Sequence, residues 1–143
     1  MTDKSTFKTA LIVTVHCLVG CVIGEFLGLV IGVSLGLSPW KNMALATFLA
    51  FLVGLFLASR SIVTSHKITY SKALKIIWAG ESASILAMEI AMNATDYWIG
   101  GVQTSSIWNP IFWIGLAAAI PVGYITALPV NYYLIRKHLK SCH

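Results

Sequence analysis

The sequence predicts an all-α integral membrane protein: a bundle of four transmembrane helices with both termini in the cytoplasm. Three observations predict this fold. Hydrophobic residues make up 57% of the 143 residues and charged residues only 10%, whereas soluble domains are about 45–50% apolar and about 25% charged. The apolar residues fall in four long segments, and lysine and arginine gather on one side of them. A soluble domain of this length could not bury so much apolar surface.

The predicted spans cover about residues 9–37, 42–59, 73–99 and 111–135 of a single domain, 1–143. Each is near or above the roughly 20 residues that a membrane-spanning helix needs, and the second is the shortest. Helix is required because lipid cannot satisfy exposed backbone groups. The first segment is too long for the apolar region of a signal peptide, which has about 7–15 residues.

Lysine and arginine set the expected orientation, because cytoplasmic loops carry an excess of both. The N-terminal segment, the connection between the second and third spans, and the C-terminal tail are all basic, whereas the opposite side has only Lys41. We therefore expect both termini in the cytoplasm, in a plasma or bacterial inner membrane. Aromatic residues expected near the opposite interface are Trp40, Tyr97, Trp98, Trp108 and Trp113.

Small residues recur every four positions in all four spans, which lets helix backbones approach closely in lipid. The strongest row is in the first span and comprises Gly20, Gly24, Gly28, Gly32 and Gly36. The third span has an alanine row on the face opposite its polar residues, so we expect protein on both sides of that helix. These rows predict tight packing and no particular chemistry.

Four of the five acidic residues fall inside the predicted spans, and this is the most informative feature of the sequence. An ionised side chain at the centre of a span costs about 2.5–3.5 kcal/mol. No lysine or arginine falls deep within the spans, so we expect no basic partner for these acids within the chain. They are Glu25, Glu81, Glu89 and Asp96. They would then face protons, water, a metal ion or another subunit.

Helical spacing brings polar residues onto shared faces. At 100° per residue, Cys17, Cys21 and Glu25 lie within about 80° on the first span. On the third span, an arc of about 140° contains Glu81, Met88, Glu89, Met92, Asn93 and Asp96. The fourth span returns with Asn131 in its cytoplasmic third. We therefore predict an intramembrane polar site between the first, third and fourth spans, with Asp96 and Asn131 as additional polar lining.

Histidine, cysteine, methionine and glutamate together are typical transition-metal ligands. Thiolate and thioether favour copper(I), whereas carboxylate with imidazole suits iron or zinc. The sequence predicts a site for copper, iron or zinc, serving transport, loading or sensing, since a bound dication lets clustered carboxylates stay ionised. Its candidate ligands are His16, Cys17, Cys21, Glu25, Glu81, Met88, Glu89, Met92 and Asn93.

Two other interpretations stay open. The chain could be a proton- or cation-coupled channel or transporter that uses Glu81, Glu89 and Asp96 without metal. It could also be a structural subunit of a larger membrane complex, whose basic residues would pair with these acids. Cys17 and Cys21 matter only for the metal interpretation.

An enzyme is less favoured, because the chain has no CxxC, no H-x3-H, no Glu-x-x-His and no nucleophile elbow. The basic residues suit an anionic leaflet and not nucleic acid. The expected partners are the lipid bilayer and, because so small a bundle rarely forms a pathway alone, further copies of the chain or subunits of a complex. The tail, with His138, Cys142 and His143, is expected to be a solvated basic end.

Three strings resemble a small integral membrane family catalogued as domain of unknown function 4396. They are HCLVGCVIGEFLG in the first span, ESASILAMEIAMN in the third and FWIG…GYITALPVNYYLI in the last. The resemblance runs from about His16 to His138 and implies a membrane fold without an activity. Some relatives have aspartate or an apolar residue in place of Cys21 and Glu25. The resemblance then implies that His16, Asn93 and Asn131 are the more general elements.

Overall fold

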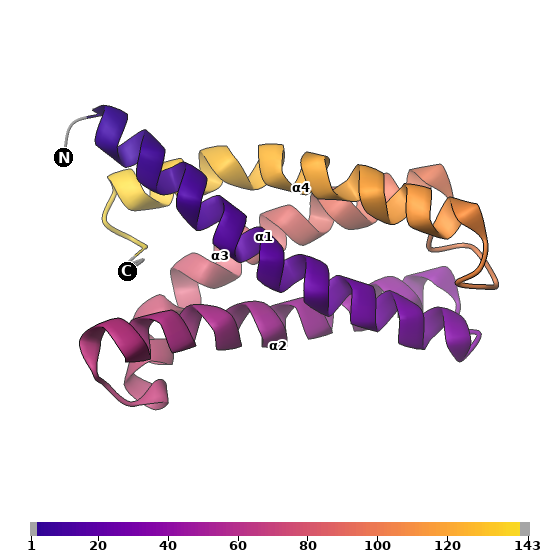
Figure 1. The fold of residues 1–143 in the computed structure, drawn as a ribbon, viewed down its shortest axis with the longest axis horizontal. Coiled ribbons are helices and arrows are strands. Elements are labelled where there is room, and N and C mark those ends of the chain that lie inside the picture. Colours follow the sequence, from indigo (N-terminus) through magenta and orange to yellow (C-terminus); the bar gives the residue numbers. More distant parts are fainter. Residues whose placement is uncertain (1–2, 141–143) are drawn as a thin grey trace.

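The computed structural model describes residues 3–140, which form four helices joined by short connections (Figure 1). The helices are α1 (Asp3–Ser34), α2 (Pro39–His66), α3 (Tyr70–Ile99) and α4 (Pro110–Arg136). All four predicted segments are therefore helical. The largest difference is in α2, which runs seven residues beyond the predicted end at 59 to give 28 residues in all.

Local sequence sets where the helices begin and end. A proline lies in the first turn of both α2 and α4, where its missing N–H costs nothing. The Asn109 side chain caps α4 by accepting a hydrogen bond from the Ile111 N–H at 3.0 Å. Gly100 ends α3 with a φ of 97°, a left-handed conformation that glycine adopts without strain. Pro121 and Pro129 lie inside α4, and the helix continues through both.

The helices run alternately up and down, so the start of α1 and the end of α4 lie at the same end as the α2–α3 turn (Figure 1). We call this the basic end, since it carries Lys67 and Arg136. The other end, with the α1–α2 turn and residues 100–109, is the loop end. At the basic end, the Tyr132 hydroxyl donates a hydrogen bond to Asp3 and so ties α4 to α1.

The α1–α2 contact is built on the predicted glycine row. A Cβ on Gly28 would lie 2.8 Å from the Ala46 nitrogen, and one on Gly20 would lie 3.0 Å from the Gly54 Cα. The α1 backbone therefore packs directly on α2, as small residues every four positions predict. Gly36 does not take part, because it lies beyond the end of α1 and has nothing within 4 Å of its Cβ position.

Three of the helices, α1, α2 and α4, are long and apolar enough to cross a membrane, by length and composition. This confirms the membrane character expected from the sequence. Helix α3 has 30 residues but does not meet the same criteria, because its acids lower its average hydropathy. Its outward face is nevertheless apolar, with exposed side chains that include Leu74, Ile76, Leu86, Ile90 and Trp98.

Candidate functional site

The four acids of the spans all lie inside the bundle. Glu25 is 0% exposed, Glu89 1%, Asp96 2% and Glu81 5%. Three of them come from α3, whose 3.6-residue period turns its acids inward and its large apolar side chains outward. The interior is therefore polar along most of its length, as the sequence predicts.

Glu81 is paired at the basic end, contrary to the prediction that no acid has a basic partner in the chain. The Lys140 ammonium lies 3.2 Å from its carboxylate. The same ammonium donates hydrogen bonds to the Ser84 hydroxyl and to the Asn131 Oδ1, each at 2.7 Å. Asn131 in turn donates from Nδ2 to the Thr14 hydroxyl at 2.9 Å. Side chains from α1, α3, α4 and the tail thus form one buried network.

The reason for this correction is a turn that spacing along the helices does not reveal. After α4 ends, His138 adopts a left-handed φ of 56°, and the Leu139 N–H donates to the Leu134 carbonyl at 2.8 Å. The chain then passes over Gly80, where a Cβ would lie 2.8 Å from the Leu139 carbonyl oxygen. The tail up to Lys140 is therefore folded back onto α3, whereas we expected it to be solvated. Cys142 and His143 lie outside the described residues.

The two thiols occupy the middle of the bundle. Cys17 and Cys21 are both free and buried, one helical turn apart and in contact with each other. Cys17 also contacts Ser84, and Cys21 contacts Glu89. Both thiols share one buried cluster with Met88 and Met92 of α3. The structure thus brings together the sulfur groups that the sequence selected as ligands.

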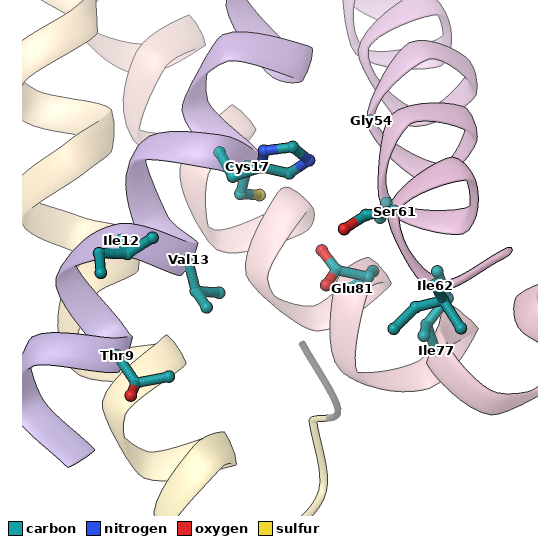
Figure 2. A pocket seen from close by; sticks show the side chains of 11 residues that line it. Thr9, Ile12, Val13, Cys17, Gly54, Ser61, Ile62, Ile77 and Glu81 are labelled. Atoms are coloured by element: carbon teal, nitrogen blue, oxygen red, sulfur yellow. The ribbon is translucent and has the colours of Figure 1, made fainter. Parts of the chain in front are cut away.

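His16, next to Cys17 on α1, lines a cavity of about 270 Å³ between α1, α2 and α3. Figure 2 shows Cys17, Ser61 and Glu81 around that cavity, one from each of the three helices. The rest of its wall is mostly apolar and includes Ile62 and Ile77. The predicted ligand His16 thus lines the same cavity as Cys17 and Glu81, but it is itself exposed and lies outside the buried core.

The loop-end half of the core holds carboxyls without enough partners. Glu25 has no hydrogen-bond partner for either carboxyl oxygen within residues 3–140, and neither Glu89 Oε1 nor Asp96 Oδ1 has one. The carboxyls of Glu89 and Asp96 both interact electrostatically with the Glu25 carboxyl. Asp96 packs against Gly101 and Gly115, which leave room for its carboxyl. Three acids therefore share this half of the core, and the buried ion pair of the described chain belongs to Glu81 and to none of these three.

Glu89 is linked to α2 through Asn93. The Asn93 Nδ2 donates to the Thr47 hydroxyl at 2.9 Å and to the Glu89 carboxylate at 3.4 Å. Sequence reasoning missed Thr47 and placed no site residue on α2, because a lone threonine carries no signal of its own. Ser84 was also missed, although it lies one turn from Glu81 on the same face.

In the described part of the chain, no three His, Cys, Asp or Glu side chains are grouped closely enough to hold a metal ion. The alanine row of α3 was expected to be covered by protein, either within the chain or from another copy. Ala79 and Ala83 are exposed and Ala87 is only partly buried, so this face of α3 is not covered by protein within the chain. Protein on that face would come from another copy of the chain or another subunit, which stays a prediction.

One protein-family model matches the chain. It covers residues 6–140 and describes a domain of unknown function, DUF4396. No curated protein and no solved structure matches the chain.

Proposed function

Because the chain belongs to the DUF4396 family, whose description gives no activity, we propose a function from its own residues: it moves protons, or a small cation coupled to protons, along the buried carboxyls. The observation that carries this proposal is the Glu25 carboxyl, fully buried with no partner for either oxygen in the described chain. Such a group in lipid is stable when it holds a proton or a cation, and intramembrane acids are typical of proton relays.

We further propose that α3 is a fourth span and that the basic end faces the cytoplasm of a plasma or inner membrane. Helix α3 packs alongside three apolar helices, is 30 residues long, and shows an apolar face outward. The basic end carries most of the lysine and arginine, among them Lys67, Lys72 and Arg136. Positive residues favour the cytoplasmic side.

Polar groups follow one another along the core, which supports a relay. Asp96 and Glu25 interact at the loop end, and Glu25 faces Glu89. From Glu89 the contacts run through Cys21 and Cys17 to Ser84. Ser84 accepts a hydrogen bond from Lys140, which is paired with Glu81. The Glu25 carboxyl has no hydrogen-bond partner in the described residues, so a proton that passes to or from it needs an intervening water molecule. At the basic end, the inserted Lys140 closes the row.

The test is proton flux into vesicles that contain purified Glu25→Gln protein. We expect the flux to fall at least about tenfold, since glutamine keeps the shape of glutamate but cannot release a proton, and intramembrane acids of relays are rarely replaceable. Asp3→Asn is the matched control, because Asp3 is the one acid outside the core and is exposed. Equal flux in wild type and Glu25→Gln would contradict the proposal.

A second candidate function is the transition-metal site, which we propose for copper, iron or zinc. The observation in its favour is the shared buried cluster of Cys17, Cys21, Met88 and Met92, with Glu89 against Cys21. Thiolate and thioether ligands select copper(I). Glu25 belongs to the same polar core, whereas Glu81 is paired with Lys140 and His16 is an exposed residue that lines the neighbouring cavity.

Elemental analysis of detergent-purified protein tests this second candidate. We expect near-stoichiometric metal in wild type and its loss in both Cys17→Ser/Cys21→Ser and Glu25→Gln/Glu89→Gln, because removing ligands removes affinity. Cys142→Ser is the control for adventitious binding by a thiol. Wild-type protein that stays free of metal after incubation with each ion would leave the proton relay as the only proposal.

A further inference from the structure

A groove of about 770 Å³ opens between α2 and α3 in the loop-end half. Its walls are mostly apolar side chains, including Met43 and Phe48 of α2 and Leu86 and Ile90 of α3. Phe48, Leu86 and Ile90 are each at least half exposed on the outside of the bundle. The groove therefore opens sideways, toward the space that lipid fills around a membrane protein.

The floor of this groove is polar and acidic. Glu89 lines it although its side chain is only 1% exposed, and its Oε1 has no hydrogen-bond partner in residues 3–140. Asn93 and Thr47 lie beside it in the groove and are hydrogen-bonded to each other. A buried carboxyl with an unused oxygen thus lies behind the groove, and a molecule that enters from the side can pair with it by displacing the side chains that cover it.

Two aromatic rings stand at the loop-end mouth of the groove. Trp40 from the first turn of α2 and Tyr97 from the last turn of α3 have ring centroids 5.3 Å apart, and both line the groove. Aromatic faces attract a cation within about 6 Å of the ring centre, and tryptophan does so best. The aromatic pair at the mouth and the Glu89 carboxyl at the floor therefore both favour a positively charged ligand.

We propose that this groove binds a lipophilic organic cation with a single positive charge, such as a quaternary ammonium or phosphonium. The apolar walls suit the substituents, the aromatic pair suits the entering charge, and the Glu89 carboxylate neutralises it at the floor. Ligand pockets of about 300–1,000 Å³ with a few convergent polar groups are typical of drug-sized molecules. The inference rests on the proposed function, since it names the substrate class that would exchange with a proton at Glu89.

The charge of the ligand, and not its shape, distinguishes an organic cation from the other possible occupants of the groove. A lipid chain or a second copy of the protein would use the apolar walls and leave the Glu89 carboxyl without a counter-charge. Two probes of nearly the same shape and opposite charge, tetraphenylphosphonium and tetraphenylborate, make the distinction directly. The titratable groups that face Glu89 from α1, Cys21 and Glu25, add no positive charge that would attract the anion.

The experiment is equilibrium binding of both probes to the purified full chain in detergent. We expect saturable binding of tetraphenylphosphonium, with tetraphenylborate at least about tenfold weaker, since one ion pair out of water exceeds the 1.4 kcal/mol of a tenfold change. Glu89→Gln should weaken the phosphonium at least about tenfold. Trp40→Leu should weaken it about threefold to tenfold through loss of the cation–π contact.

Two control variants keep the protein otherwise comparable. Trp108→Leu removes an exposed tryptophan at the same end that does not line the groove, and Asp3→Asn removes an acid far from it. Both should bind the phosphonium as wild type does. If Glu89→Gln fails to fold, Trp40→Leu and the comparison of the two probes on wild type still decide the question.

Equal binding of the two probes, no binding of the phosphonium, or unchanged binding in Glu89→Gln and Trp40→Leu would each overturn the proposal. The groove would then be a lipid-facing surface or a contact between copies. The proton relay is judged separately, by the flux of Glu25→Gln. Loss of flux in Glu25→Gln without phosphonium binding would therefore reject the groove and keep the relay.

Discussion

Replacing Lys140 with methionine should lower the free energy of unfolding by about 3–5 kcal/mol, the usual cost of removing one partner of a buried ion pair. Methionine keeps most of the length of the side chain but carries no charge. It leaves the buried Glu81 carboxylate without the ammonium at 3.2 Å, and Ser84 and Asn131 lose a shared donor. Unfolding of detergent-solubilised protein, monitored by circular dichroism during titration with sodium dodecyl sulfate, measures the change.

Two further variants separate the ion pair from a general effect of charge. Lys137→Met removes an exposed lysine three residues earlier and should change stability by less than about 0.5 kcal/mol. The double variant Glu81→Met/Lys140→Met should recover most of the loss, because an apolar pair replaces a buried ion pair at little cost. Wild-type stability in Lys140→Met would show that the tail does not occupy the core in detergent.

Gly24→Ala should destabilise the bundle by at least the roughly 1–3 kcal/mol typical of overpacking. Its Cβ would lie 2.5 Å from both the Ala50 nitrogen and the Leu49 carbonyl oxygen. These are backbone atoms of α2, so no side-chain rotation relieves the clash and the two helices must separate. The same unfolding titration, together with size-exclusion chromatography, measures the loss.

The control for Gly24→Ala is Val19→Leu, which also adds volume to α1 but at a side chain that is 49% exposed. It should be close to neutral. Combining Gly24→Ala with Ala50→Gly should not restore stability, because the contacted atoms belong to the α2 backbone and remain in place. Restoration by Ala50→Gly would show that the helices meet through side chains and not through backbone.

The features that helical periodicity determines could be predicted from the sequence. The four helices, the glycine row of α1 against α2, and the inward acids of α3 all depend on residues spaced three or four apart, so each can be located without knowing the neighbours. In α4, the small residues spaced four apart from Gly115 to Ala127, and Asn131 one turn later, are likewise buried. Within the site, the contact of Cys21 with Glu89 joins two faces predicted separately on α1 and α3.

The features that sequence reasoning missed depend on contacts between distant parts of the chain. Lys140 reaches Ser84 across 56 positions, and a basic tail residue after a span usually marks the membrane surface. Its path depends on the left-handed turn at His138 and on the absence of a side chain at Gly80. Thr47 gains its role only because Asn93 of α3 lies opposite it. Neither contact follows a helical period, so neither can be recognised in a single sequence.

The folded-back tail also bears on how the protein is made. Ribosomes synthesise α3 before the tail, so Glu81 leaves the ribosome while the 56 positions that separate Ser84 from Lys140 have yet to emerge. During that interval its carboxyl must take up a proton or stay in contact with water or the insertion machinery. The buried ion pair, and with it the closed basic end of the bundle, therefore forms only after the tail has been synthesised.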